Sequence, residues 1–284
     1  MRTSARITGV VILTLLAVVG VIWYAVFSED RAGILRVSFL DVGQGDAVLV
    51  TAPSGIQVLI DGGPDAGVLR RIAAVMPWYD RSLDVVIASH PDADHITGLL
   101  DVVQRYQVGM FLTSSVHGST EMWKKLQKEV QSKHIPAITA QRGQILSLGG
   151  GAYMEILSPD RAVPHVDTNV GCVVARLVYG TTSFLLPCDA PRSVEEYLVT
   201  LDGSNLGSTV LKAGHHGSKT SASLLFVGYT NPQYVVFSRG CANKYGFPSP
   251  ETVSLFKKFN IQAVDTCEQG TITFVSDGNT VSQK

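Results

Sequence analysis

Short apolar runs separated by glycine-rich or polar turns make up most of the chain from residue 34 onward. Runs such as 83–90 (LDVVIASH) are almost continuously apolar, which is typical of strands buried on both faces. Segments such as 95–106 have apolar residues at helical spacing, which predicts amphipathic helices. We predict strands over 34–42, 47–53, 56–63, 83–90, 108–114, 152–159, 171–180, 182–190, 208–218, 232–240, 262–267 and 271–277, and helices over 66–79, 95–106, 120–134, 192–201, 221–229 and 249–260.

The strand-rich blocks come in two halves, each accompanied by helices, and no long linker separates them. Each amphipathic helix and each sheet must bury its apolar face against another layer. The pattern therefore predicts one α/β domain over 35–284, built from two sheets packed face to face with helices outside.

The N-terminal segment follows a different pattern. Residues 7–27 carry no charge, and a helix of that length spans the roughly 30 Å core of a bilayer. Arg2 and Arg6 precede it, so we expect residues 1–6 in the cytoplasm, 7–27 as a single transmembrane anchor and the remaining domain outside the cytoplasm. A cleaved signal peptide is the alternative, although the apolar run exceeds the usual signal core of roughly 7 to 15 residues.

Composition adds two constraints. The 284 residues carry a formal net charge of −1, so binding of nucleic acid would need a local basic surface. None of the four cysteines forms a C-x-x-C pair, which disfavours a cysteine zinc knot. Outside the cytoplasm a disulfide between Cys241 and Cys267 is a hypothesis, and two free buried cysteines are the alternative.

Metal-ligand side chains cluster where the predicted strand 83–90 ends. His90, Asp92, Asp94 and His95 fall within six positions. Alone, this segment is equally well explained as a polar turn that caps a helix. Asp189 and the pair His215–His216 lie at two later strand ends, however, and strand-end loops often meet at one site. Together these residues favour a site for two divalent metals bridged by a carboxylate.

These segments resemble a known family. The pattern H-x-D-x-D-H over 90–95, followed by Gly98, is similar to the metal motif of the metallo-β-lactamase superfamily, where histidine commonly stands in place of Asp92. The segments FLDVGQGDAVLV (39–50), LIDGG (59–63), LKAGHHGS (211–218) and SRGCANKYGFPSPETVSLF (238–256) resemble, more specifically, the C-terminal hydrolase domain of ComEC-type DNA-uptake proteins. The resemblance covers roughly residues 35–278. The channel and oligonucleotide-binding portions of full ComEC proteins have no match here.

The resemblance implies an αββα sandwich with two divalent metal ions, zinc or manganese, at one edge. Six residues are expected to be metal ligands: His90, Asp92, Asp94, His95, Asp189 and His215. Asp94, Asp189, His216 and Asn169 are expected to take part in catalysis, with His216 behind the metals or as a proton donor. Asp41, Asp46 and Asp61 are expected to support the ligands, and Asp41 and Asp46 are equally well explained as turn stabilisers.

The chain departs from the family pattern at several positions. The third histidine usual between Asp94 and Asp189 has no clear match, and Asn169 in DTNVG stands nearby with His165. The usual TGD is PCD here, which places Cys188 beside Asp189. The usual YGHP is YGFP, so Phe247 replaces a histidine. The resemblance to DNA-uptake proteins implies a nuclease activity. These changes argue against that activity more than they argue against metal binding.

The residues and the resemblance together lead to a functional hypothesis. Two metals support hydrolysis, and Asp92 makes the site harder than an all-imidazole zinc site, which favours Mn²⁺. Residues 203–250 contain no Asp or Glu, and Lys219, Lys244 and Tyr245 are candidate contacts for an anionic substrate. We expect a membrane-anchored phosphodiesterase that acts on DNA during uptake, with a separate DNA-channel protein as partner. The alternatives are hydrolysis of a small phosphoester, a cell-surface substrate or a β-lactam, and a degenerate domain that binds DNA or a partner.

Overall fold

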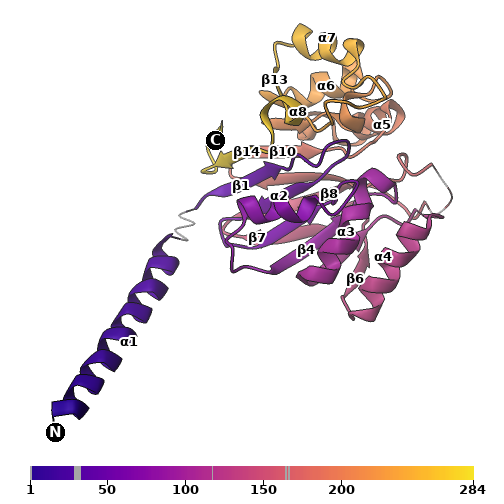
Figure 1. Ribbon diagram of the computed structural model, residues 1–284. Helices are drawn as coiled ribbons and strands as arrows, with labels where there is room; N and C mark the ends of the chain where they lie inside the picture. The colour runs from indigo at the N-terminus through magenta and orange to yellow at the C-terminus, as the bar shows by residue number, and fades with distance from the viewer. Residues whose placement is uncertain (1, 29–32, 117, 164, 166) are drawn as a thin grey trace. The chain divides into compact units, whose positions relative to one another are not determined.

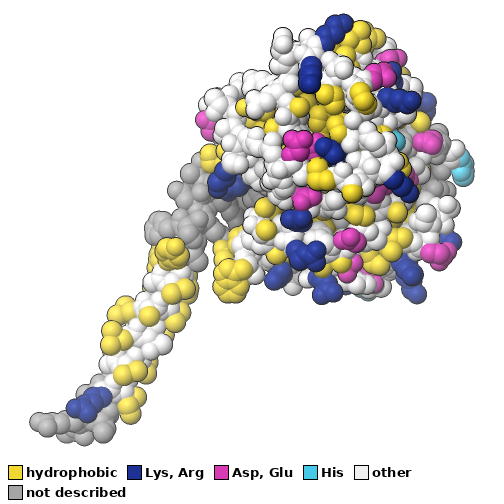
Figure 2. All heavy atoms as spheres, turned by 45° about the horizontal axis from the view of Figure 1, so that its top comes forward, with side chains coloured by type: hydrophobic (Ala, Val, Ile, Leu, Met, Phe, Trp, Pro, Cys, Tyr) yellow, Lys and Arg dark blue, Asp and Glu magenta, His cyan; other side chains and the backbone are white. Residues whose placement is uncertain are grey.

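The computed structural model describes residues 2–28, 33–116, 118–163, 165 and 167–284, and its contacts divide the chain into two units, Met1–Ala32 and Gly33–Lys284. The first unit consists of helix α1 (Arg2–Ser28). Its stretch Arg6–Tyr24 is long and apolar enough to cross a membrane, a test that a signal sequence near the N-terminus also passes. Figure 2 shows patches of hydrophobic side chains along the described part of this helix and a basic side chain near its N-terminal end.

The second unit is a four-layer αββα sandwich, which confirms the predicted fold (Figure 1). The first sheet has the strand order β15-β14-β1-β2-β3-β4-β5-β6 and the second β13-β12-β11-β10-β9-β8-β7. The first sheet consists of β1 (Leu35–Phe39), β2 (Val48–Thr51), β3 (Gln57–Ile60), β4 (Ser82–Ala88), β5 (Gln107–Thr113), β6 (Ala137–Thr139), β14 (Ile272–Ser276) and β15 (Val281–Gln283). The second consists of β7 (Ile145–Gly149), β8 (Ala152–Ser158), β9 (Val174–Tyr179), β10 (Thr182–Leu186), β11 (Val210–Lys212), β12 (Tyr234–Phe237) and β13 (Gln262–Asp265).

Helices cover the outer face of each sheet (Figure 1). The outer face of the first sheet packs against α2 (Val68–Val75), α3 (Ala93–Arg105) and α4 (Glu121–Ser132). The outer face of the second packs against α5 (Arg192–Asp202), α6 (Leu224–Thr230) and α7 (Pro250–Lys258), and the short helix α8 (Thr266–Gln269) follows β13. Two short 3₁₀ segments, Gly203–Leu206 and Gly214–Gly217, precede and follow β11.

Strand β4 shows why its sequence is apolar at consecutive positions. Val85 and Ile87 point into the core between the sheets, whereas Val86 and Ala88 pack under the outer helices. Successive side chains of a strand face opposite sides of the sheet, so a strand covered on both faces needs apolar residues throughout.

Parallel pairing brings the chemically reactive strand ends to one edge. Strands β3, β4 and β5 are mutually parallel, and so are β10, β11, β12 and β13. Asp61 follows β3, His90 follows β4, Asp189 follows β10 and the histidine pair follows β11. The carboxyl ends of parallel strands are the usual position of ligand sites in α/β proteins.

Several boundaries differ from the sequence-based prediction. Helix α2 ends at Val75 instead of residue 79, because Met76 adopts an extended conformation before Pro77. Strands β6, β7 and β15 and helix α8 were not predicted. All three strands lie at sheet edges and have exposed residues, so they lack the continuous apolar pattern of the central strands.

Candidate metal centre

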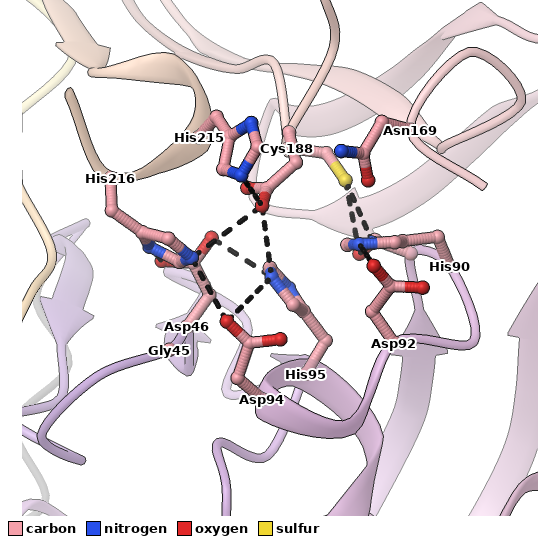
Figure 3. Close-up of polar contacts among 12 residues, drawn as sticks. Gly45, Asp46, His90, Asp92, Asp94, His95, Asn169, Cys188, His215 and His216 are labelled. Carbon is pink, nitrogen blue, oxygen red and sulfur yellow. Dashed lines mark hydrogen bonds and ion pairs between the residues drawn. The ribbon is translucent and has the colours of Figure 1, made fainter. Parts of the chain in front are cut away.

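Asp61 orients His95 from behind the site. The Nδ1 atom of His95 lies 2.8 Å from Asp61 Oδ2, and Asp61 also accepts hydrogen bonds from the backbone N–H and the hydroxyl of Ser89. A proton held on Nδ1 by the carboxylate leaves Nε2 free as an acceptor. The buried Nε2 atom points into the centre, 3.4 Å from Asp189 Oδ2 and 4.0 Å from Asp94 Oδ2 (Figure 3).

His216 points into the same centre from the second sheet. Its Nδ1 donates to the carbonyl of Ser238 at 2.9 Å, which again leaves Nε2 as the free nitrogen. That atom lies 3.3 Å from Asp94 Oδ2 and 3.5 Å from Asp189 Oδ2. The side chain is buried, with 1% of its area exposed.

His215 occupies a different environment from its neighbour. Its side chain is 28% exposed, and its Nε2 lies 3.7 Å from Asp189 Oδ2. Its Nδ1 lies 3.3 Å from the hydroxyl of Thr220. Both histidines have left-handed backbone dihedrals, with φ of 48° and 56°, and the two side chains leave this tight turn in different directions (Figure 3).

The spacing of these atoms fits a shared cation. Ligand atoms bound to one metal at about 2.1 Å with tetrahedral angles lie roughly 3.4 Å apart. The distances from Asp189 to His95 and His216 are 3.4 and 3.5 Å, too long for strong hydrogen bonds but suited to common ligation. Five buried atoms here have no hydrogen-bond partner among the described residues: His90 Nε2, His95 Nε2, His216 Nε2, Asp46 Oδ1 and Asp189 Oδ1. Buried polar atoms are rarely left unsatisfied, so the donor set fits a divalent metal.

The other side of the centre is built around His90. Its Nε2 lies 3.7 Å from Asp92 Oδ2, and its Nδ1 lies 3.0 Å from the hydroxyl of Ser89. Asn169 reaches this side from the loop before β9, and its Oδ1 is buried without a partner among the described residues (Figure 3). The sequence-predicted residues His90, Asp92 and Asn169 are therefore brought together.

Cys188 is one departure from the family pattern, and it lies directly behind the site. It has a left-handed φ of 56°, a conformation that favours the glycine usual at this position. Its thiol contacts Ser89 Oγ and His90 Nδ1, each at 3.2 Å. Burial and the neighbouring Cys172 raise the pKa of this thiol well above its ordinary value, so it remains a neutral thiol behind His90.

Lys212 is a buried cation of the site that was not among the residues predicted from the sequence. Only 2% of its side chain is exposed, and its Nζ lies 2.6 Å from Asp46 Oδ2 and 3.9 Å from Asp189 Oδ1. Asp46 also lies 3.5 Å from the Nδ1 of His216. The available signal was a lysine at the end of an otherwise apolar strand, three positions before His215. Lys212 fixes Asp46 and neutralises part of the carboxylate charge behind the centre.

The electrostatics of the site favour bound cations. Burial alone would lower the pKa of His216, but Asp189 and Asp46 outweigh that effect and raise it to about 9. Burial likewise opposes protonation of His95, yet Asp189 and Asp61 raise its pKa well above the usual value. For His215, burial prevails and lowers the pKa. The buried carboxylates thus attract positive charge towards the free nitrogens of His95 and His216.

The remaining predicted residues lie outside this cluster. Asp41 accepts a hydrogen bond from Arg71 at 2.8 Å and another from the backbone N–H of Gly43, as a turn stabiliser would. Lys219 is exposed on the loop after the histidines. Lys244 and Tyr245 are exposed on the loop 239–249, which runs past the open side of the centre, where Phe247 packs against both His215 and His216.

The loop 239–249 is held by a disulfide. Cys241 and Cys267 are bonded, which confirms the sequence-based hypothesis, while Cys172 and Cys188 are free and buried. The bond ties the loop to the start of α8. The Nε atom of Arg239 also donates to Asp265 at 2.7 Å.

Removing this disulfide should destabilise the protein and loosen the loop. Closing a loop between residues 26 apart restricts the unfolded chain by about 3.5 kcal/mol at 25 °C in the chain-entropy model. We expect the Cys241→Ser, Cys267→Ser double variant to unfold at lower denaturant concentration than the native protein, and reductant to reproduce that shift. The Cys172→Ser variant is the control, because it lacks one free cysteine but keeps the disulfide. Reductant should therefore still lower the denaturant midpoint of this variant. An unchanged midpoint in the double variant would contradict the expectation.

Comparison with known proteins assigns the family. A model of the metallo-β-lactamase superfamily matches residues 40–237. The chain belongs to this superfamily. The superfamily fold generally serves metal-dependent hydrolases and binds divalent metals, typically zinc, which agrees with the ligand cluster at the strand ends.

The curated relatives include competence proteins. The chain is 26% identical over 261 residues to ComE operon protein 3 of Bacillus subtilis (strain 168), covering 84% of this chain and 33% of the relative. It is 31% identical over 239 residues to Competence protein ComA of Neisseria gonorrhoeae, covering 84% and 32%. The predicted resemblance to competence proteins is thus confirmed. The chain spans about a third of the length of these relatives.

Solved structures agree on the fold. CmlA, a diiron β-hydroxylase from Streptomyces venezuelae, superposes with a TM-score of 0.52 and 15% sequence identity. The match covers 81% of this chain and 52% of that chain. At this identity the likeness concerns the fold alone.

Proposed function

We propose that this metallo-β-lactamase-fold protein is a membrane-anchored phosphodiesterase that cleaves DNA during uptake, with its hydrolase domain outside the cytoplasm. The observation that carries the proposal is the convergence of the free Nε2 atoms of His90, His95 and His216 on the carboxylates of Asp94 and Asp189. The names of the curated relatives support a role in competence. A separate DNA-channel protein remains the partner we propose.

We propose the following ligands. Asp94, His95 and His216 would hold one cation, His90 and Asp92 the other, and Asp189 would lie between them. Asn169 would join His90 and Asp92 as a ligand of the second cation, through its Oδ1, which has no hydrogen-bond partner among the described residues. When bound, two divalent ions supply an acidified water and a Lewis acid for a phosphoryl oxygen. The carboxylate-rich donor set supports Mn²⁺ alongside Zn²⁺.

His215 and His216 exchange roles in this proposal relative to the sequence-based assignment. His216 is buried, and its Nε2 lies within 3.5 Å of both Asp94 and Asp189, as a ligand requires. His215 is partly exposed beside the loop 239–249 and keeps its imidazole accessible. His215 would therefore lie beside the leaving oxygen as a neutral imidazole, because burial lowers its pKa, and would donate an N–H hydrogen bond to that oxygen in place of the histidine usual at position 247.

Two observations support the location. Arg2 and Arg6 lie at the N-terminal end of the apolar helix α1, which favours a cytoplasmic N-terminus and an external domain. The Cys241–Cys267 disulfide suits an oxidising compartment outside the cytoplasm.

The proposal is tested by DNA cleavage with the full chain in detergent. We expect Mn²⁺ or Zn²⁺ to support hydrolysis of single- or double-stranded DNA, and two equivalents of metal to bind per chain. Asp189→Asn should abolish hydrolysis and reduce bound metal, because it removes the bridging charge while keeping the side-chain shape. Asp101→Asn on the outer part of α3 is the matched control and should retain both. Absence of cleavage with either metal, in a protein that binds two equivalents, would refute the nuclease activity.

The alternatives give different results in the same assays. A hydrolase of a small phosphoester or cell-surface substrate would bind metal and cleave a model phosphoester but not DNA. A β-lactamase would hydrolyse a chromogenic lactam, although a carboxylate-rich site is better suited to phosphates. A degenerate domain would not bind metal stoichiometrically, and it would not hydrolyse any of these substrates.

A further inference from the structure

A groove opens beside the metal centre, between the loops of the two sheets. Its volume is about 440 Å³, within the size range of pockets that hold small ligands. Gln44, Pro64 and Asp94 line it from the first half of the chain, and Asn243, Lys244 and Tyr245 from the second. Because Asp94 belongs to both the groove and the metal cluster, a ligand in the groove lies next to the reacting centre.

Tyr245 lines one side of this groove and is stacked on a second aromatic ring behind it. The rings of Tyr245 and Phe247 are stacked, with centroids 5.4 Å apart and planes 16° apart. Phe247 in turn lies with its ring 5.6 Å from that of His215. Tyr245 is 56% exposed, so a large part of its ring is open to a planar ligand. Tyr245 therefore lies at the solvent side of the pair, and Phe247 lies between it and His215.

The backbone of the loop that carries Tyr245 and Phe247 is held in place before any ligand binds. The side-chain amide of Asn243 donates to the carbonyls of Gly240 and Phe247, and its Oδ1 accepts from the N–H of Phe247. The backbone N–H of Gly240 donates to Gln44 Oε1 at 3.3 Å, which links this loop to the loop after β1. A preorganised wall loses little conformational entropy on binding.

The charges on this loop favour an anionic ligand. Lys244 is exposed, and its ammonium lies 5.3 Å from the centre of the Tyr245 ring. Its flexible side chain can leave the ring and contact a phosphate when a planar group takes its place. A ligand that placed a quaternary ammonium on Tyr245 would instead meet the like charge of Lys244.

We propose that this groove holds one unpaired nucleotide of a DNA or RNA strand, with its base stacked on Tyr245 and its phosphate beside Lys244. The inference rests on the proposed function and deepens it, because it places an unpaired nucleotide next to the phosphodiester that is cleaved. A base within a duplex is covered on both faces by its neighbours, so the groove selects single strands. Stacking uses a face that every base has, so the subsite tolerates any sequence.

Binding without metal tests the subsite separately from catalysis. The full chain in detergent with EDTA is titrated into a single-stranded oligonucleotide that carries one 2-aminopurine, whose fluorescence reports stacking. Tyr245→Ala should weaken binding about 10-fold or more, the loss typical of one stacked base. Tyr245→Phe should retain binding. Tyr229→Ala removes a tyrosine of similar exposure, 46%, on α6 and should bind like the native protein.

Three further probes identify the ligand. The same strand in a duplex and an abasic strand of equal length should both bind more weakly than the intact single strand, and an RNA strand distinguishes the two sources of an unpaired nucleotide. The subsite is refuted if Tyr245→Ala binds like the native protein or if the abasic strand binds as tightly as the intact one. Stacking without metal-dependent cleavage would refute the proposed nuclease alone, and cleavage unaffected by Tyr245→Ala would refute the subsite alone.

Discussion

Replacing His216 by alanine should lower metal-dependent DNA hydrolysis by more than about 100-fold and reduce bound metal from two equivalents to one, whereas His215→Ala should keep two equivalents. Loss of a residue that only supports a ligand typically costs 10–100-fold in metal affinity or activity, and loss of a ligand should cost at least as much. The buried Nε2 of His216 faces Asp94 and Asp189, and the hydrogen bond to Ser238 fixes its tautomer. Metal analysis and cleavage rates measure both effects.

The neighbouring variant makes the comparison decisive. His215→Ala removes the same side chain from the adjacent residue of the same turn, and it should lower turnover without lowering bound metal. The opposite pattern, with metal lost in His215→Ala and retained in His216→Ala, would restore the assignment made from sequence order. Thermal unfolding of both metal-free variants shows whether either change acts through the fold.

The sequence carried enough information for the fold because the central strands and helices follow simple periodicities. Strand β4 is apolar at consecutive positions since both of its faces are covered, and α3 follows it with a clear helical spacing. His90 and Asp189 were recognisable because parallel strands end in polar residues at one edge. The bounds of α2 and the edge strands escaped prediction, because exposure and a single proline decided them.

The roles of the two histidines and of Lys212 depend on the direction in which each side chain points. That direction cannot be read from the neighbouring residues in the sequence. His215 and His216 are neighbours in sequence, yet two left-handed residues in succession turn only one of them inward. The role of Lys212 depends on its pairing with Asp46, which lies 166 positions earlier in the chain and is brought to it only by the packing of the two sheets. Neither arrangement follows from hydrophobic periodicity.

Gly98, which follows the ligand motif, lies so close to the loop after β3 that a larger residue would not fit. A Cβ atom added there would lie 2.0 Å from the carbonyl oxygen of Gly62 and 2.6 Å from that of Asp65. The two backbones also exchange hydrogen bonds, from Gly98 N–H to Gly63 and from Gly62 N–H to His95. Helix α3 therefore rests directly on the loop after β3. This contact sets the distance between Asp61 and His95, and with it the direction of the His95 imidazole.

Gly98→Ala should accordingly destabilise the fold and weaken metal binding together. Overpacking against backbone costs about 1–3 kcal/mol or more, which corresponds to a fall of about 2–4 °C in Tm per kcal/mol for a domain of this size. Displacement of α3 would move Asp94 and His95 away from Asp189. Gly228→Ala on α6 is the matched control, because its added Cβ would only reach ordinary contact with Phe259 at 3.8 Å. Since alanine favours helix over glycine, that variant should be neutral or slightly more stable. Equal melting temperatures for the two variants would show that α3 can move away from the loop without cost, and that Gly98 does not hold the metal ligands in place.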